Sequence, residues 1–204
     1  MKLFGILALL LLPTALLAQS PAAAAGGEAT LWAGGEGTTF NPDYSCKSNS
    51  PFQCWGNQLV GPTAFFDFNV TPKWGVEGEA RWLHWNGQGG MTMANYLVGG
   101  RYRIVRFDRL SGWARLLVGG GWIQTPNYPQ AGSLKGSFFA YAPGATVEYR
   151  LGRRLALRGD YEYQIWPSFY GPPTYSSTGT LQEHDNGLTP NGLSIGISYR
   201  ILGP

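Results

Sequence analysis

The sequence has 204 residues, the length of one ordinary domain. It contains 30 glycines, 14% aromatic residues and only 13% charged residues; soluble domains average roughly 25% charged residues, so this composition favours a β-rich protein of another kind. The formal net charge of +3 is too small to indicate a nucleic-acid partner.

An export signal is predicted at the N-terminus. The positive start Met1-Lys2 precedes an uninterrupted apolar run, Leu3–Leu12, and a small-residue exit at Ala15–Ala18. We interpret residues 1–18 as a cleaved signal peptide and residues 19–27 as a flexible Ala/Gly linker. An uncleaved membrane anchor is the alternative, but the run is short for a spanning helix. An exported chain with no later apolar helix can cross a membrane only as a β-barrel.

Period-two alternation of apolar and polar residues then predicts eight strands. In chain order they span Ala29–Gly35, Val60–Val70, Gly75–Trp85, Ala94–Val105, Trp113–Ile123, Phe138–Arg150, Leu155–Trp166 and Asn191–Ile201. In the seventh, the leucines and tyrosines fall on one face, whereas Arg158, Asp160 and Glu162 fall on the other. Pro143 lies inside the sixth predicted strand, where it marks a bulge or a bend.

The connections between these strands alternate between long and short. The short ones are the predicted turns Thr71–Trp74, Arg106–Gly112 and Leu151–Arg154, and the longest are the polar loops Thr38–Asn57 and Tyr170–Thr189. This alternation is typical of an antiparallel up-and-down barrel in one membrane. The long loops would then lie outside the cell, and the tight turns and both termini would lie on the periplasmic side.

Both cysteines, Cys46 and Cys54, fall in the first long loop. In an oxidising compartment we expect them to form one loop-closing disulfide. A metal site would need further ligands, and neither His84 nor His184 lies near the cysteines in the sequence. We therefore expect no metal and no cofactor.

Aromatic residues on the apolar faces gather near both ends of the predicted strands. Amphipathic rings prefer the two interfaces of a membrane, and a soluble barrel gives no reason to sort them in this way. The two predicted girdles comprise Phe68, Trp82, Tyr96, Tyr102, Trp122, Tyr141, Tyr149, Tyr163 and Tyr199.

The opposite faces carry six acids and seven arginines, and no lysine. These residues are Asp67, Glu77, Glu79, Arg81, Arg101, Arg103, Arg115, Glu148, Arg150, Arg158, Asp160, Glu162 and Arg200. In a narrow barrel such side chains fill the interior, where charges persist only when they are paired. We therefore predict an all-β, eight-stranded antiparallel up-and-down transmembrane β-barrel over residues 28–204, with a salt-bridged plug rather than a wide aqueous pore.

The pattern resembles the small outer-membrane β-barrel family of the OmpA/OmpX type, without its peptidoglycan-binding domain. The segments Arg158–Tyr163 and Gly192–Arg200 carry the resemblance. The second is similar to the C-terminal strand that the outer-membrane assembly machinery recognises, so the resemblance implies this partner and a bacterial outer-membrane location. The chain departs from the family by continuing past Tyr199 to Pro204, since family members usually end on an aromatic residue.

The favoured function is a non-enzymatic outer-membrane barrel, structural or adhesive, that presents loops 38–57 and 170–189 to an unknown extracellular ligand. Outer-membrane lipid would surround the barrel, and we expect a monomer. Loops on a rigid scaffold are where binding specificity usually lies.

Three alternatives remain open. A lipid-modifying barrel enzyme would need a nucleophile and a base together, for which His84 near the outer rim and Ser168 are the candidates. A narrow channel would conduct ions through the charged interior. A soluble secreted barrel of lipocalin type would fold without detergent.

Overall fold

The computed structural model describes residues 29–43, 58–85, 90–125, 135–170, 174–175, 181–182 and 186–203. The predicted signal peptide, the linker, and the cysteines Cys46 and Cys54 lie outside these residues. Within the described part of the chain, no helix is long and apolar enough to cross a membrane.

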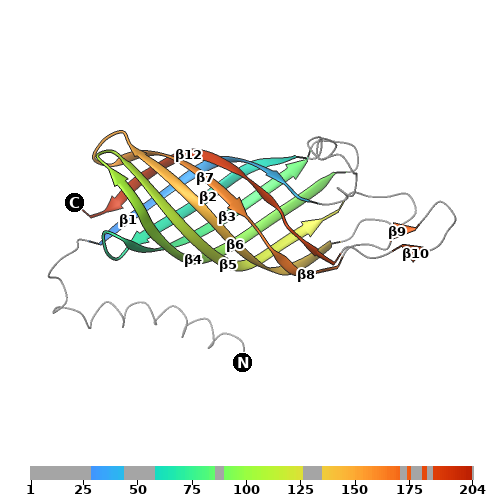
Figure 1. The fold of residues 1–204 in the computed structure, drawn as a ribbon. Coiled ribbons are helices and arrows are strands. Elements are labelled where there is room, and N and C mark those ends of the chain that lie inside the picture. Colours follow the sequence, from blue (N-terminus) through green and yellow to red (C-terminus); the bar gives the residue numbers. More distant parts are fainter. Residues whose placement is uncertain are drawn as a thin grey trace, which may run out of the picture.

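Eight strands form a closed antiparallel barrel, as the sequence predicts (Figure 1). They are β1 (Thr30–Asn41), β2 (Leu59–Asn69), β3 (Trp74–Trp85), β4 (Met91–Phe107), β5 (Leu110–Gln124), β6 (Lys135–Arg150), β7 (Leu155–Tyr163) and β12 (Asn191–Leu202). Each strand pairs with its neighbour in the chain, except that β7 pairs with β12, and β12 closes the barrel against β1. The short turns lie at the same end of the barrel as the start of β1 and the end of β12 (Figure 1).

Four further short strands follow β7 at the opposite end. β8 (Trp166–Tyr170) pairs with β11 (Asn186–Leu188), and β9 (Thr174–Tyr175) pairs with β10 (Leu181–Gln182). The connection predicted as a polar loop is therefore partly built of strands. Trp166, which the sequence places at the end of the seventh barrel strand, begins β8 instead.

Several predicted strand ends differ from the structure, most of all at β1 and at the turn between β4 and β5. β1 continues to Asn41 instead of ending at Gly35, so the first residues of the predicted loop 38–57 belong to the barrel wall. β4 and β5 extend through the predicted turn 106–112 and leave only residues 108–109 between them. Asp108 adopts a φ of 40°, in the left-handed region that aspartate tolerates better than most residues.

Of the bulge or bend predicted at Pro143, the bulge does not occur. The pairs Tyr141–Ile165 and Gly144–Glu162 keep one register on either side of the proline, so no residue is inserted. The β6–β7 ladder is only interrupted there, because proline has no N–H to donate.

The outer surface of the barrel carries the apolar face of each strand. Exposed aliphatic side chains such as Val98, Leu116 and Ile195 occupy its middle. All nine predicted girdle residues face outward; seven are exposed, and Tyr102 and Trp122 are half-buried. That they meet two membrane interfaces stays a prediction.

The half of the interior nearest the long connections is filled by apolar side chains, which we call the apolar cap. It comprises Phe40, Leu59, Leu83, Met91, Met93, Leu97, Leu117, Ile123, Ala140, Ala142, Trp166, Phe169 and Leu188, with Phe138 packed against them. The Trp166 side chain is fully buried and its ring lies against Phe138, with centroids 6.1 Å apart. The alternation in the sequence predicts only charged residues in the interior, so this cap is not predicted from it.

Gly121 and Gly120 on β5 give a matched test of the cap. A Cβ at Gly121 would lie 2.2 Å from the Trp166 ring, whereas one at Gly120, on the outer surface, would have no atom within 4 Å. We expect Gly121→Ala to lower the free energy of unfolding by about 1–3 kcal/mol through overpacking. Gly120→Ala should leave it unchanged or raise it by up to about 1 kcal/mol, because glycine is unfavourable within strands.

Urea unfolding of both variants in detergent micelles, followed by tryptophan fluorescence, measures the difference. Equal stabilities for the two variants would mean that Trp166 does not fill the lumen at Gly121.

Candidate functional site

Four arginine side chains are buried near the middle of the barrel. Arg81 on β3, Arg101 on β4, Arg115 on β5 and Arg158 on β7 are each at most 4% exposed. All four lie on the strand faces that point into the lumen, opposite the apolar outer faces, so the alternation of each strand places them there. We call these arginines and the acids that contact them the charged layer.

Arg158 joins opposite walls of the barrel. Its Nη1 and Nη2 each donate at 2.6 Å, to Asp67 Oδ2 and to Glu77 Oε1. Its Nε lies 2.6 Å from Asp160 Oδ2 and 3.1 Å from Glu36 Oε1. Carboxylates from β1, β2, β3 and β7 thus converge on one guanidinium, whose planar fork of five N–H donors suits such a site.

Glu162 on β7 accepts hydrogen bonds from two arginines of other strands. Arg81 Nη1 and Arg115 Nη2 both lie 2.8 Å from its oxygens. Glu79 also contacts both arginines, at 2.6 Å from Arg81 Nη2 and 2.9 Å from Arg115 Nη1. These four side chains form a closed ring of ion pairs across the lumen.

Arg101 extends the charged layer toward the end with the short turns. It pairs with Asp67 and with Glu148. Its guanidinium also stacks on the Trp113 ring, 4.0 Å from the centroid, and Arg103 lies over the same ring at 4.7 Å. Trp113 Nε1 donates to Glu148 at 3.1 Å.

An amide pair links the charged layer to the apolar cap. Gln164 donates to Glu162 at 2.6 Å, and its own oxygen accepts from Asn95 at 2.5 Å and from Trp166 Nε1 at 2.8 Å. The indole N–H of the fully buried tryptophan and both polar atoms of the Gln164 amide are therefore used within one network. This chain of contacts fixes Trp166 in place above the charges.

The interior charges are distributed differently from the prediction. Arg103, Arg150 and Arg200 are only half-buried, at the rim with the short turns. Glu36, which the sequence analysis did not assign, is buried in the charged layer. Seven carboxyl groups there share four guanidinium groups: Glu36, Asp67, Glu77, Glu79, Glu148, Asp160 and Glu162. Glu36 pairs with one guanidinium, that of Arg158, at the longer of the two distances from its Nε, so it is the most weakly paired acid.

The structure does not bring the two candidate enzyme residues into one site. His84, on β3, is exposed on the outer surface, and Ser168 is exposed on β8 beyond the barrel. Beside His84 lies a hollow of about 450 Å³ that Trp82 and Trp122 also line. Within the described residues, the His84 side chain has no hydrogen bond or ion pair, so no orienting acid or nucleophile is in place beside it.

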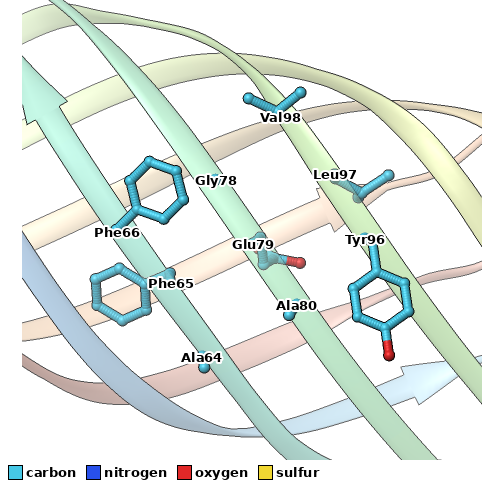
Figure 2. Close-up of a pocket in the computed structure, with 9 residues that line it drawn as sticks. All are labelled: Ala64, Phe65, Phe66, Gly78, Glu79, Ala80, Tyr96, Leu97 and Val98. Atoms are coloured by element: carbon cyan, nitrogen blue, oxygen red, sulfur yellow. The ribbon is translucent and has the colours of Figure 1, made fainter. Parts of the chain in front are cut away.

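A second hollow, of about 420 Å³, lies on the outer wall across β2, β3 and β4 (Figure 2). Its floor is made by the small residues Ala64, Gly78 and Ala80, and Phe66 and Tyr96 flank it (Figure 2). It lacks the converging polar groups that orient a substrate in an active site. Its chemistry suits a hydrocarbon chain.

Comparisons with known proteins agree with this geometry. Residues 7–200 match the family described as "Outer membrane protein beta-barrel domain". No curated protein matches the sequence.

Solved structures share the fold at low sequence identity. Ail, the attachment invasion locus protein of Yersinia pestis, has a TM-score of 0.51 and 16% identity, over 86% of this chain and 99% of that one. Neisserial surface protein A has a TM-score of 0.57 and 9% identity, over 84% and 96%. OprG from Pseudomonas aeruginosa has a TM-score of 0.54 and 12% identity, over 86% and 97%. A further structure of Ail contains the heparin analogue sucrose octasulfate.

Two acids of the charged layer should respond oppositely to loss of their charge. Glu162→Gln removes one of the two acids that Arg81 and Arg115 share, the other being Glu79, and breaking a buried pair typically costs about 3–5 kcal/mol. Glu36→Gln replaces a poorly paired buried carboxyl group with a neutral amide of the same shape, so we expect a change within about 1 kcal/mol or a gain in stability.

Urea unfolding in detergent micelles compares the two variants with the parent chain. A larger loss for Glu36→Gln than for Glu162→Gln would show that the ion pairs are arranged differently from those described.

Proposed function

Because the chain belongs to the outer membrane protein β-barrel family, we propose that it is a non-enzymatic protein that presents its long loops outside the cell as a structural or adhesive surface. The observation that carries the proposal is the filled interior. The charged layer occupies the middle of the lumen and the apolar cap occupies its outer half. Binding is then left to the loops, since neither layer offers a cavity for a substrate.

The bases of the two longest loops are held rigidly. Trp166 and Phe169 on β8 and Leu188 on β11 are buried in the apolar cap, which anchors the start and end of the second loop. Thr189 at the end of this loop donates a hydrogen bond to Asp43 in the first. The two loops therefore start from one shared platform, which favours a single composite binding surface.

The chemistry of these loops favours a neutral ligand over a polyanion. Loops 38–57 and 170–189 contain one lysine, Lys47, against Asp43, Glu183 and Asp185. Their aromatic residues and many hydroxyl and amide groups suit stacking and hydrogen bonding. Ail binds a heparin analogue, but these loops lack the basic residues that a sulfated polymer requires.

The proposal also includes the export signal, the disulfide of the first loop and the location of the chain. Residues 1–18 act as a cleaved signal peptide, residues 19–27 as a linker, and Cys46 and Cys54 form a disulfide in the first loop. The chain is a monomer in the outer membrane, inserted by the assembly machinery through its C-terminal strand. The lipid-modifying alternative rests on His84, and the isolation of that side chain from Ser168 counts against it.

Adhesion of bacteria that produce the chain tests the loop hypothesis. A non-adherent strain producing the parent chain should bind cultured epithelial cells more than the empty strain does. Replacing residues 44–57 and 171–185 with short Gly/Ser linkers should abolish the gain, and added heparin should not inhibit it. The Gly120→Ala variant, which changes only the outer wall, is the matched control.

Adhesion that survives loop replacement would contradict the proposal. Inhibition by heparin would contradict the expectation of a neutral ligand. If the parent chain does not increase adhesion over the empty strain, the adhesive role is excluded and only the structural role is retained.

A further inference from the structure

Basic side chains gather at the end of the barrel that carries the short turns. They are Lys73, Arg103, Arg106, Arg109, Arg150, Arg153, Arg154 and Arg200, which we call the basic end. Among the described residues of this end, the acids are Asp108 and Glu148, and Glu148 already pairs with Arg101. The opposite end, as far as it is described, carries only Asp43, His84 and Lys135. The described barrel is therefore strongly asymmetric in charge.

Backbone hydrogen bonds place the basic residues side by side around the rim. The N–H of Arg103 donates to the Lys73 carbonyl at 2.8 Å, and that of Arg150 donates to the Arg109 carbonyl at 2.8 Å. The N–H of Arg200 likewise donates to the Arg154 carbonyl at 2.8 Å. Like charges on adjacent strands repel one another.

The half-buried Arg103 and Arg150 lie in the field of further cations. The exposed Arg106 repels both of them and Arg200 repels Arg150, whereas Glu148 attracts both. The repulsion among these arginines is unfavourable in the protein alone. An anion bound at the rim would relieve this repulsion at several arginines at once.

Apolar side chains are interleaved with these charges. Phe107 and Leu110 flank the turn at 108–109, and Leu151 begins the turn at 151–154; all three are exposed. The fully exposed Arg154 donates to the hydroxyl of Tyr199, on the outer wall, at 3.3 Å. Exposed apolar groups beside cations are typical of surfaces that enter a membrane interface, where phosphate groups lie.

We propose that the basic end binds the phosphate groups of anionic phospholipids in the periplasmic leaflet. The turn arginines Arg106, Arg109, Arg153 and Arg154 contact headgroups around the rim, and Phe107, Leu110 and Leu151 enter the acyl boundary. An acidic protein segment would satisfy the charges but would leave these apolar side chains in water. The proposal concerns the end opposite the loops and does not depend on the adhesive role.

Native mass spectrometry of the refolded chain in detergent micelles tests the proposal. Phosphatidylglycerol, zwitterionic phosphatidylcholine and inorganic phosphate are each added at equal concentration. We expect at least about tenfold stronger retention of phosphatidylglycerol than of phosphatidylcholine, because one arginine near an anionic surface contributes about fivefold. Inorganic phosphate alone should not be retained.

The variant carrying Arg106→Gln, Arg109→Gln, Arg153→Gln and Arg154→Gln should lose that preference. Lys135→Gln, at the opposite end, should keep it, and heat-modifiable migration of each variant on a gel verifies folding. Equal retention of both lipids, or a preference that survives in the fourfold variant, would overturn the proposal. Displacement of phosphatidylglycerol by an equal charge of polyglutamate would overturn it in favour of an acidic protein partner.

Discussion

The ion pairs of Arg158 with carboxylates on β1, β2, β3 and β7 join opposite walls of the barrel. An eight-stranded barrel is only wide enough for side chains to fill it, so this guanidinium has no bulk water to solvate it. Burying a charge is costly unless its partners are well placed. The strands β1, β2, β3 and β7 must therefore pair in the register that brings their acids to this guanidinium. Closure of the barrel and pairing of its interior charges thus depend on each other.

The side chains above and below the charged layer separate these ion pairs from water. On the side of the long loops, Gln164 joins Glu162 of the charged layer to Asn95 and Trp166, and the apolar cap lies above them. At the end with the short turns, Arg103 lies over Trp113 and Arg200 over Trp32, and arginines outnumber the acids around them. The lumen is thus occupied along its length, and both of the binding surfaces that we propose lie at its ends. The loops offer polar and aromatic groups, and the basic end offers cations.

Alternation along the sequence is enough to predict the barrel, because a strand between lipid and a packed interior repeats every two residues. It fails in β1, where glycines interrupt the pattern. A Cβ at Gly34 would lie 2.5 Å from the Phe65 ring, so glycine there marks close packing, and ending the strand early leaves Glu36 out of the predicted interior. The apolar cap cannot be predicted from the sequence for another reason. Leu83 occupies an interior position, but only assembly of distant segments brings it to Trp166.

The central claim is that paired charges and the apolar cap close the lumen, and single-channel recording of the refolded chain in a planar bilayer tests it most directly. The account predicts no unitary current steps at either polarity, in protein whose insertion is verified by protease protection of the strands. Reproducible unitary conductance, with an ion selectivity that changes in Glu162→Gln, would contradict it. Such a current would have to pass through the layer that Arg115 and Glu162 close.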